Sequence, residues 1–251
     1  MKAFLLALQF LTVIPLKFKQ VDGKRIARSM VYFPAVGLLV GLLLAGINRA
    51  LLFLGFNGFS VNVVLVVALI VLTGGMHLDG LADAADAFLS GKDKQEMLRI
   101  MRDSRIGVMG VLSLVSAILL KIALLLALSV KVRAAALLLM CLISRWGMVA
   151  LLFLFPYARN EGKAKAYSEG STPWIFLGAT FITLVCAGII WQWKAAVPLA
   201  AVTLLCCFFG RYAHRKVGGI TGDVAGAQNE LAEIMVLFAI VVMERMGAWI
   251  R

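Results

Sequence analysis

Long apolar runs separated by short polar segments dominate this chain. A membrane-spanning helix needs about 20 mostly apolar residues, and seven stretches approach or exceed that length: 30–54, 57–76, 106–130, 132–156, 173–193, 195–210 and 231–249. Another apolar run, 3–16, is too short for a clear span and contains Pro15 near its end. The pattern predicts an all-α, polytopic integral membrane helical bundle, with about seven transmembrane helices plus a short N-terminal apolar helix.

The composition indicates the same class. Hydrophobic residues make up 62% of the 251 positions, charged residues make up 15%, and the mean hydropathy is +0.96. Soluble domains are about half apolar and about a quarter charged, so a soluble core of this size could not bury so much apolar surface. No internal repeat divides the chain, and we expect a single membrane-embedded domain over residues 1–251.

Positive charge is unevenly distributed between the predicted spans. If the spans alternate in direction, four polar segments share one side and carry 16 of the 25 Lys and Arg residues: 17–29, 77–105, 157–172 and 211–230. Lys and Arg favour the cytoplasmic side of a membrane, so we expect these segments to face the cytoplasm. The net charge of +12 arises mainly there, where it attracts anionic lipids and would also attract a phosphorylated substrate.

The acidic residues lie on or beside the same face, with Glu244 as the exception. Acidic residues contribute little to the topology rule, so their placement needs another cause. A face that gathers both signs of charge indicates a polar reaction site.

The segment HLDGLADAADAFLSG, residues 77–91, carries three aspartates at the spacing i, i+4, i+7. On a helix, Asp79, Asp83 and Asp86 project from one stripe. Like charges on one stripe destabilise a helix unless they are neutralised, and magnesium prefers one or two carboxylates together with waters and substrate phosphates. The stripe therefore predicts a Mg²⁺ site. The alternative is a solvated acidic helix end, which would normally mix Lys, Glu and Gln among the acids.

A second segment, HRKVGGITGDVAGAQNE, covers residues 214–230. Gly218, Gly219 and Gly222 allow the backbone to approach a ligand closely, and exposed N–H groups in such turns bind phosphate oxygens. Asp223 follows directly and adds a carboxylate on the same predicted side. The glycines alone would fit a flexible loop equally well.

Several cations are candidates for phosphate binding. Arg102 and Arg105, in MRDSRIGVMG, could each bind phosphate through two donors, although Asp103 and Ser104 between them also suit a helix cap.

Arg145 is predicted to lie deep in a span, where an arginine is unfavourable and usually faces a partner or a cavity. We expect it to pair with a site carboxylate or a substrate phosphate. Lys121, nearer the outer end of its span, is expected to snorkel to the interface. His77 suits a general base or a structural hydrogen bond better than a magnesium ligand.

Three strings together, GGMHLDGLADAADAF, RDSRIGVMG and GGITGDVAGAQNE, resemble the cobalamin synthase family, the adenosylcobinamide-GDP ribazoletransferases. The resemblance covers the whole chain, including an N-terminal run that ends in TVIPL. One departure is Ala87, because the family often has Gly soon after the third aspartate. The resemblance implies a multi-pass enzyme of the bacterial inner membrane, with its active-site loops facing the cytoplasm. It would use Mg²⁺ to complete the nucleotide loop of vitamin B12.

The resemblance also implies the reaction and a role for each candidate residue. A ribose hydroxyl of α-ribazole, or of its 5′-phosphate, attacks the phosphorus attached to cobinamide in adenosylcobinamide-GDP, and GMP leaves. The product is adenosylcobalamin or its 5′-phosphate. The metal ligands would be Asp79, Asp83 and Asp86, with Asp223 completing the metal site or activating the hydroxyl. The residues expected to hold phosphate are Arg102, Arg105, Arg145, Gly218, Gly219 and Gly222.

Two other interpretations of the sequence stay open. One is a different magnesium-dependent membrane transferase acting on a diphosphate, such as a CDP-alcohol phosphotransferase or a prenyltransferase, although their usual motifs are absent. The other is a transporter, which would favour broken helices and paired repeats. The released product, whether GMP, CMP, pyrophosphate or none, separates these classes. As further partners we expect membrane lipids and no nucleic acid, and the sequence is compatible with a homo-oligomer.

Overall fold

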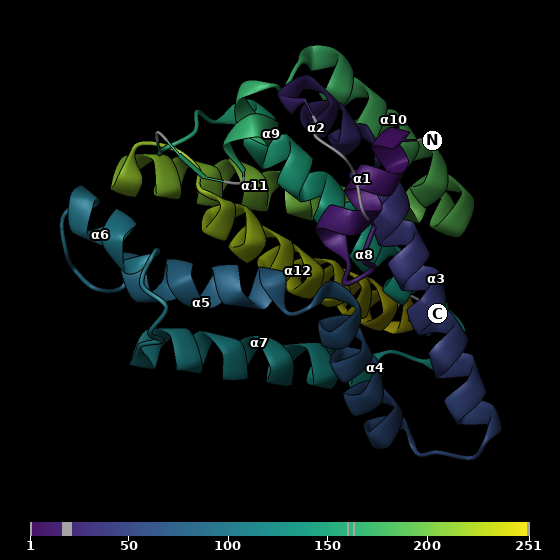
Figure 1. The fold of residues 1–251 in the computed structure, drawn as a ribbon. Coiled ribbons are helices and arrows are strands. Elements are labelled where there is room, and N and C mark those ends of the chain that lie inside the picture. Colours follow the sequence, from purple (N-terminus) through teal and green to yellow (C-terminus); the bar gives the residue numbers. More distant parts are fainter. Residues whose placement is uncertain (1, 17–21, 160, 163, 250–251) are drawn as a thin grey trace.

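The computed structural model describes residues 2–16, 22–159, 161–162 and 164–249, and all regular secondary structure in these ranges is helical. Tyr157 and Ile220 add a single isolated β-bridge. The helices, drawn in Figure 1, are α1 Lys2–Leu11, α2 Gly23–Ser29, η1 Met30–Tyr32, α3 Phe33–Phe53, α4 Gly58–Thr73, α5 Met76–Phe88, α6 Lys94–Ile100, α7 Val108–Ala127, α8 Val130–Leu154, α9 Lys165–Glu169, α10 Pro173–Trp191, η2 Gln192–Ala195, α11 Ala196–Val217 and α12 Gly222–Trp249.

Five helical stretches are long and apolar enough to cross a membrane: Gly23–Phe53, Val108–Ala127, Val130–Leu154, Pro173–Val217 and Gly222–Gly247. The bent pair α4 and α5 makes a sixth if it is taken as one span. The predicted all-α membrane architecture and the short N-terminal apolar helix, α1, are confirmed. The expected number of about seven differs because Pro173–Val217 counts as one stretch of 45 residues. The sequence had predicted two spans there, and the stretch contains both α10 and α11.

Helix α8 forms the centre of the bundle. It packs against α3, α10, α11 and α12. Within its most apolar stretch of 18 residues, 83% is buried inside the protein. A helix that is apolar on all sides is stable only when surrounded by other helices or lipid. Helices α5, α7 and α12 contact one another in pairs and run side by side in Figure 1. This group of three carries most of the charged residues inside the bundle.

Two consecutive glycines create the bend between α4 and α5. Gly74 and Gly75 have φ angles of 64° and 68°, which glycine adopts without the steric penalty of a side chain. The axes of α4 and α5 meet at 91°. Residues 77–88, which the sequence placed in a polar segment outside the membrane, therefore belong to a helix that packs between α7 and α12.

Helix α12 also begins earlier than the sequence predicted, at Gly222 instead of residue 231. Asp223 and Glu230 lie between these positions. Their low hydropathy is typical of a polar loop, so the sequence placed the start of the helix after them. In the structure Gln228, Asn229 and Glu230 are buried inside the bundle. Asn229 contacts His77 of α5, and Glu230 pairs with Lys121 of α7. The polar segment expected at 17–29 lies partly outside the described residues, and its second half forms α2.

Candidate functional site

Close packing between α5 and α12 builds the centre of the candidate site. A Cβ atom at Gly80 would lie 2.8 Å from the carbonyl oxygen of Asp223, and one at Gly226 would lie 3.3 Å from the carbonyl oxygen of His77. Real Cβ atoms essentially never approach backbone as closely as the first of these distances. The two glycines thus let the aspartates of α5 lie against the first turn of α12.

The carboxylates of α5 and α12 form one acidic group. Asp83 interacts electrostatically with Asp79, Asp86 and Asp223, and with the cation of Arg159. Asp79 is exposed and Asp83 is half-buried. Neither of their side chains has a hydrogen bond or an ion pair with another described residue. Within the described ranges, no three His, Cys, Asp or Glu side chains are grouped closely enough to hold a metal by themselves. Any metal here would need other ligands as well.

Asp86 differs from the other two aspartates of α5. Its Oδ2 accepts the N–H of Gly107 and its Oδ1 accepts the N–H of Gly110, both at 2.7 Å. Gly107 is the N-cap of α7, and Gly110 lies in the first turn. The N–H groups at a helix start have no partner within the helix, and a carboxylate both satisfies them and complements the helix dipole. Asp86 therefore caps α7 from a neighbouring helix.

Backbone pairing between two loops places an arginine beside Asp223. The N–H of Ala158 donates to Ile220 O at 2.9 Å, and the N–H of Ile220 donates to Pro156 O at 2.8 Å. Arg159 follows directly, and its Nη2 lies 2.8 Å from Oδ2 of Asp223. Its side chain is only 10% exposed, and its Nε has no hydrogen-bond partner among the described residues. Sequence reasoning missed Arg159, and the available signal was its place just after a span, on the predicted cytoplasmic side.

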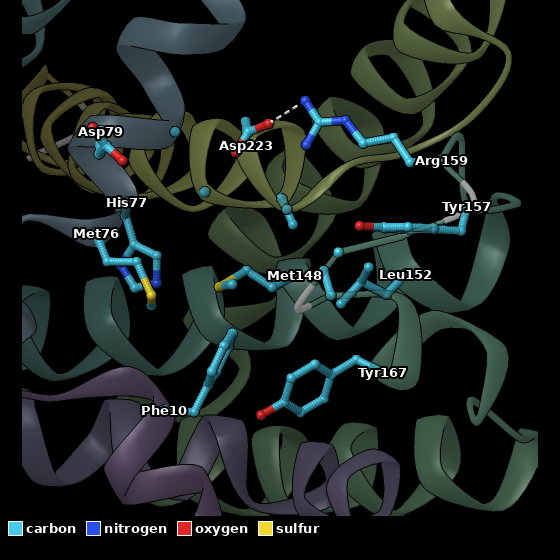
Figure 2. Close-up of a pocket in the computed structure, with 16 residues that line it drawn as sticks. Phe10, Met76, His77, Asp79, Met148, Leu152, Tyr157, Arg159, Tyr167 and Asp223 are labelled. Atoms are coloured by element: carbon cyan, nitrogen blue, oxygen red, sulfur yellow. Dashed lines mark ion pairs between the residues drawn. The ribbon is translucent and has the colours of Figure 1, made fainter. Parts of the chain in front are cut away.

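A cavity of about 310 Å³ opens beside these groups. Asp79, Asp223 and Arg159 lie along one side, and the rings of Phe10 and Tyr167 lie along the opposite side (Figure 2). The hydroxyl of Tyr157 points inward in the same view. Burial raises the pKa of this phenol, although Arg159 opposes the shift, so Tyr157 stays neutral and can donate a hydrogen bond.

Two further cavities surround the acidic group. One, of about 320 Å³, is lined by Asp79, Asp83, Arg102 and Arg105. The other, of about 510 Å³, is lined by Arg102 and Arg159 among other residues. Asp79 lines both the 310 Å³ cavity and the 320 Å³ cavity. Arg159 lines both the 310 Å³ and the 510 Å³ cavity, and Arg102 lines both the 320 Å³ and the 510 Å³ cavity. The carboxylates lie where a ligand occupying more than one cavity would have to pass.

The two arginines expected beside the aspartates differ in their pairing. Arg105 donates to both oxygens of Asp103, and this hydrogen bonding lowers the pKa of Asp103 to about 2. Asp103 therefore stays ionised at functional pH and can keep Arg105 engaged. Arg102 is exposed and makes no ion pair with another described residue. Of the two, Arg102 is the one available to a phosphate.

The three glycines predicted to bind phosphate also divide into two groups. Gly222 lines the 310 Å³ cavity. Gly218 ends α11 with φ 83°, and a Cβ at Gly219 would lie 2.3 Å from Pro156 O. Neither Gly218 nor Gly219 lines the three cavities described above. They shape the turn that holds Arg159 against Asp223.

Arg145 lies in a buried polar network away from the cavities. It is 1% exposed, and its Nη1 binds Glu233 and Ser144 Oγ. Lys121 binds Glu233 as well and lies 2.6 Å from Glu230. The partner of Arg145 is thus a carboxylate, but one that the sequence analysis did not single out. The prediction that Lys121 snorkels was wrong, because it is 3% exposed and paired inside the bundle.

The network reaches the cavity through one histidine. Asn229 Nδ2 donates to Glu233 Oε1 at 3.1 Å and lies 3.2 Å from His77 Nδ1. His77 is 2% exposed and lines the 310 Å³ cavity. Its second ring nitrogen, Nε2, is buried and has no hydrogen-bond partner in the part of the chain that the structure describes.

Comparisons with known proteins bear on this site as a whole. The family model described as cobalamin-5-phosphate synthase, CobS, matches residues 3–241. An adenosylcobinamide-GDP ribazoletransferase from Desulforamulus reducens is 37% identical over 237 residues, which cover 94% of each chain. One from Roseiflexus sp. is 39% identical over 92% of this chain and 86% of its own. One from Clostridioides difficile is 31% identical over 96% and 97%. No solved structure matches the chain.

Proposed function

The chain belongs to the cobalamin-5-phosphate synthase family, and from that premise we propose that its transfer reaction takes place at the carboxylates of α5 and α12. Its activity is that of an adenosylcobinamide-GDP ribazoletransferase, an enzyme of cobalamin biosynthesis. This membership excludes the transporter and the other diphosphate transferases.

In the proposed reaction, a ribose hydroxyl of α-ribazole or of its 5′-phosphate attacks the phosphorus attached to cobinamide. An O–P bond forms, and the bond from that phosphorus to the oxygen of GMP breaks. GMP leaves with the electron pair, and the hydroxyl loses its proton. Asp223 is placed to take this proton, since it lines the cavity. Its Oδ2 is held by Arg159 and Thr221, and its Oδ1 has no hydrogen bond with another described residue.

The observation that carries the proposal is the state of Asp79 and Asp83. Both carboxylates lie among other acids without a hydrogen bond or ion pair to a described residue. Carboxylates taken out of water are normally paired or bound to a metal, and Asp83 is half-buried. Asp79 also lines two of the three cavities that contain the arginines. Unpaired acids beside arginines are the surroundings that a metal-bound diphosphate requires.

Magnesium fits this donor set. Asp79 and Asp83 supply hard oxygen ligands, and Mg²⁺ usually takes only one or two carboxylates, with waters and substrate phosphates completing its coordination. Among the described residues, no three His, Cys, Asp or Glu side chains could hold a metal together, which is consistent with a magnesium site of one or two carboxylates. When bound, the ion would offset the charge that develops on the leaving group. Asp86 is better suited to positioning, because both of its oxygens already accept N–H groups.

The arginines would bind the phosphates of the nucleotide substrate. Arg102 lines the two outer cavities and is free of ion pairs among the described residues. Arg159 lies between the inner cavity and an outer one. Arginine matches phosphate with two parallel donors. We therefore assign the diphosphate to the space between Arg102, Arg159 and the aspartates, with these groups on the cytoplasmic side of the membrane.

The test is GMP release from adenosylcobinamide-GDP and α-ribazole by the full chain in liposomes, titrated with Mg²⁺. Asp79→Asn and Asp83→Asn should each lower the rate by about 100-fold or more, because they weaken charge stabilisation in the transition state. They should raise the Mg²⁺ concentration needed while leaving the fold intact. Asp93→Asn is the matched control, since Asp93 is a helix N-cap elsewhere on the polar face and Asn also caps helices. Wild-type rates and magnesium dependence in both variants would refute the assignment.

A further inference from the structure

The two sides of the 310 Å³ cavity differ in chemistry. One side presents the carboxylates of Asp79 and Asp223 with Arg159, and the opposite side presents aromatic rings (Figure 2). Phe10 and Tyr167 lie with ring centroids 4.6 Å apart. A ligand that fills this cavity should therefore be flat and apolar at one end and should carry its reactive polar group at the other.

The size of the cavity limits which substrate group can enter. At about 310 Å³ it lies at the lower end of ligand-pocket volumes, and a corrin macrocycle is far too large. Two flat groups remain, the guanine of the nucleotide substrate and the base of α-ribazole. Guanine presents several polar atoms along its edges, and the aromatic side of the cavity would leave them without partners, which is unfavourable. A benzimidazole-type base is apolar apart from one unsubstituted ring nitrogen.

One buried donor is available for that nitrogen. Asn229 donates from Nδ2 to the Glu233 carboxylate, and a carboxylate can only accept, so the orientation of the Asn229 amide is fixed. The same Nδ2 then donates to His77 Nδ1, which must be the unprotonated ring nitrogen of a neutral imidazole. The proton is therefore on Nε2, a buried atom that has no hydrogen-bond partner among the described residues.

We propose that this cavity is the α-ribazole site, with the base packed against Phe10 and Tyr167 and its free ring nitrogen accepting the Nε2–H of His77. The ribose then extends toward the carboxylate side, where Asp223 meets its hydroxyl. The proposal rests on the proposed function, because it takes the acceptor substrate from it. It also gives the buried network a purpose, since Lys121 and Arg145 hold Glu233, and Glu233 fixes Asn229 and hence the tautomer of His77.

The first experiment measures binding of α-ribazole alone to the full chain in detergent by equilibrium dialysis. Phe10→Ala should weaken binding by about tenfold, because the base loses a packed aromatic partner. Phe181→Ala is the matched control, since Phe181 is 69% exposed on α10, and it should bind normally. The KM for adenosylcobinamide-GDP should not change in either variant, which shows that the fold and the nucleotide site are intact.

The second experiment tests the hydrogen bond with an α-ribazole analogue in which the free ring nitrogen is replaced by CH. The wild-type chain should bind α-ribazole about tenfold more tightly than the analogue. His77→Ala should bind the two equally, an outcome that general destabilisation would not produce. Retained discrimination in His77→Ala would overturn the role of His77.

The outcomes separate the two proposals. If α-ribazole binding depends on Phe10 and His77 but no GMP is released, the reaction is wrong and the cavity assignment stands. If GMP is released and Phe10→Ala keeps a normal KM for α-ribazole, the cavity assignment is wrong and the reaction stands. If Phe10→Ala raises only the KM for adenosylcobinamide-GDP, the cavity holds the guanine end and our proposal is overturned.

Discussion

At the scale of single residues, the three aspartates of α5 share a stripe but have different surroundings. Asp79 and Asp83 face open cavities, whereas Asp86 accepts two backbone N–H groups of α7. A carboxylate without partners is available to a cation, and one with both oxygens engaged is already part of the scaffold. Substitutions that look identical in sequence should therefore change different properties of the protein.

Asp86→Asn should mainly reduce stability. An amide keeps one acceptor oxygen and loses the charge that favours a helix N-terminus, so one N–H of α7 loses its partner. We expect a loss of about 1 kcal/mol, seen as a lower unfolding midpoint in detergent. Asp79→Asn should leave the midpoint unchanged, since it removes repulsion and no hydrogen bond. An equal drop in both variants would contradict the distinction between them.

Arg159→Lys should impair the use of adenosylcobinamide-GDP. Lysine keeps the charge but offers a single point of contact in place of two parallel donors. The KM for adenosylcobinamide-GDP should rise by about tenfold, with the KM for α-ribazole nearly unchanged. Arg49→Lys provides the control, because Arg49 is exposed on α3 and lines none of the three cavities. A normal KM in Arg159→Lys would remove Arg159 from the phosphate site.

At the scale of helices, the site depends on how closely α5 approaches α12. Gly80 makes that approach possible, and the bend at Gly74 and Gly75 directs α5 along α7 and α12 instead of away from them. The geometry of the acidic group is thus determined by glycines that have no chemistry of their own.

Gly80→Ala should separate α5 from α12. The added Cβ would lie 2.8 Å from a backbone oxygen of Asp223, and backbone cannot move aside as a flexible side chain can. We expect a loss of about 1–3 kcal/mol and a large fall in GMP release, since Asp223 is displaced. Gly46→Ala is the matched control within α3, because a Cβ there meets nothing within 4 Å. In an exposed helix interior that change should be neutral or stabilising. Normal activity in Gly80→Ala would show that the spacing of the two helices is not critical.

The sequence could predict the membrane class, the helical stripe of Asp79, Asp83 and Asp86, and the presence of Asp223 nearby, because these follow from local spacing and hydropathy. It could not predict Arg159, which reaches Asp223 only through pairing of two loops about 60 residues apart. It also missed the early start of α12, because hydropathy counts Glu230 as polar and takes no account of its ion pair with Lys121. The cap that Asp86 provides depends on a helix more than 20 residues later.

At the scale of the whole molecule, one charge-balanced network connects α7, α8 and α12 deep in the bundle. Lys121 and Arg145 offset Glu230 and Glu233, and all four side chains are buried. A buried ion pair adds little net stability when complete, but removing one member leaves an uncompensated charge. We infer that the network fixes the relative positions of these helices and, through Asn229, the orientation of His77.

Glu233→Gln should be strongly destabilising. It leaves two cations with one carboxylate, and breaking a buried pair in this way removes about 3–5 kcal/mol. The unfolding midpoint in detergent should fall well below that of Asp86→Asn. Adding Lys121→Met restores the charge balance and should recover part of the loss. If the double variant is no more stable than Glu233→Gln alone, charge balance is not what the network supplies.

The placement of charge along the chain also predicts how the molecule is oriented. Lys92 and Glu161 lie on the segments that surround the acidic group and its cavities, whereas Lys194 lies in η2, between α10 and α11. Because Lys and Arg favour the cytoplasmic side, we expect the acidic group to face the cytoplasm. Lys92→Cys and Glu161→Cys, in a chain whose four native cysteines are replaced by alanine, should resist a membrane-impermeant maleimide in intact cells and react after permeabilisation. Lys194→Cys should react in intact cells.

Labelling of Lys92→Cys and Glu161→Cys from outside would place the site on the opposite face. Protection of only one of the two would mean that the loops around the acidic group do not share a side, and the shared site itself would then be wrong.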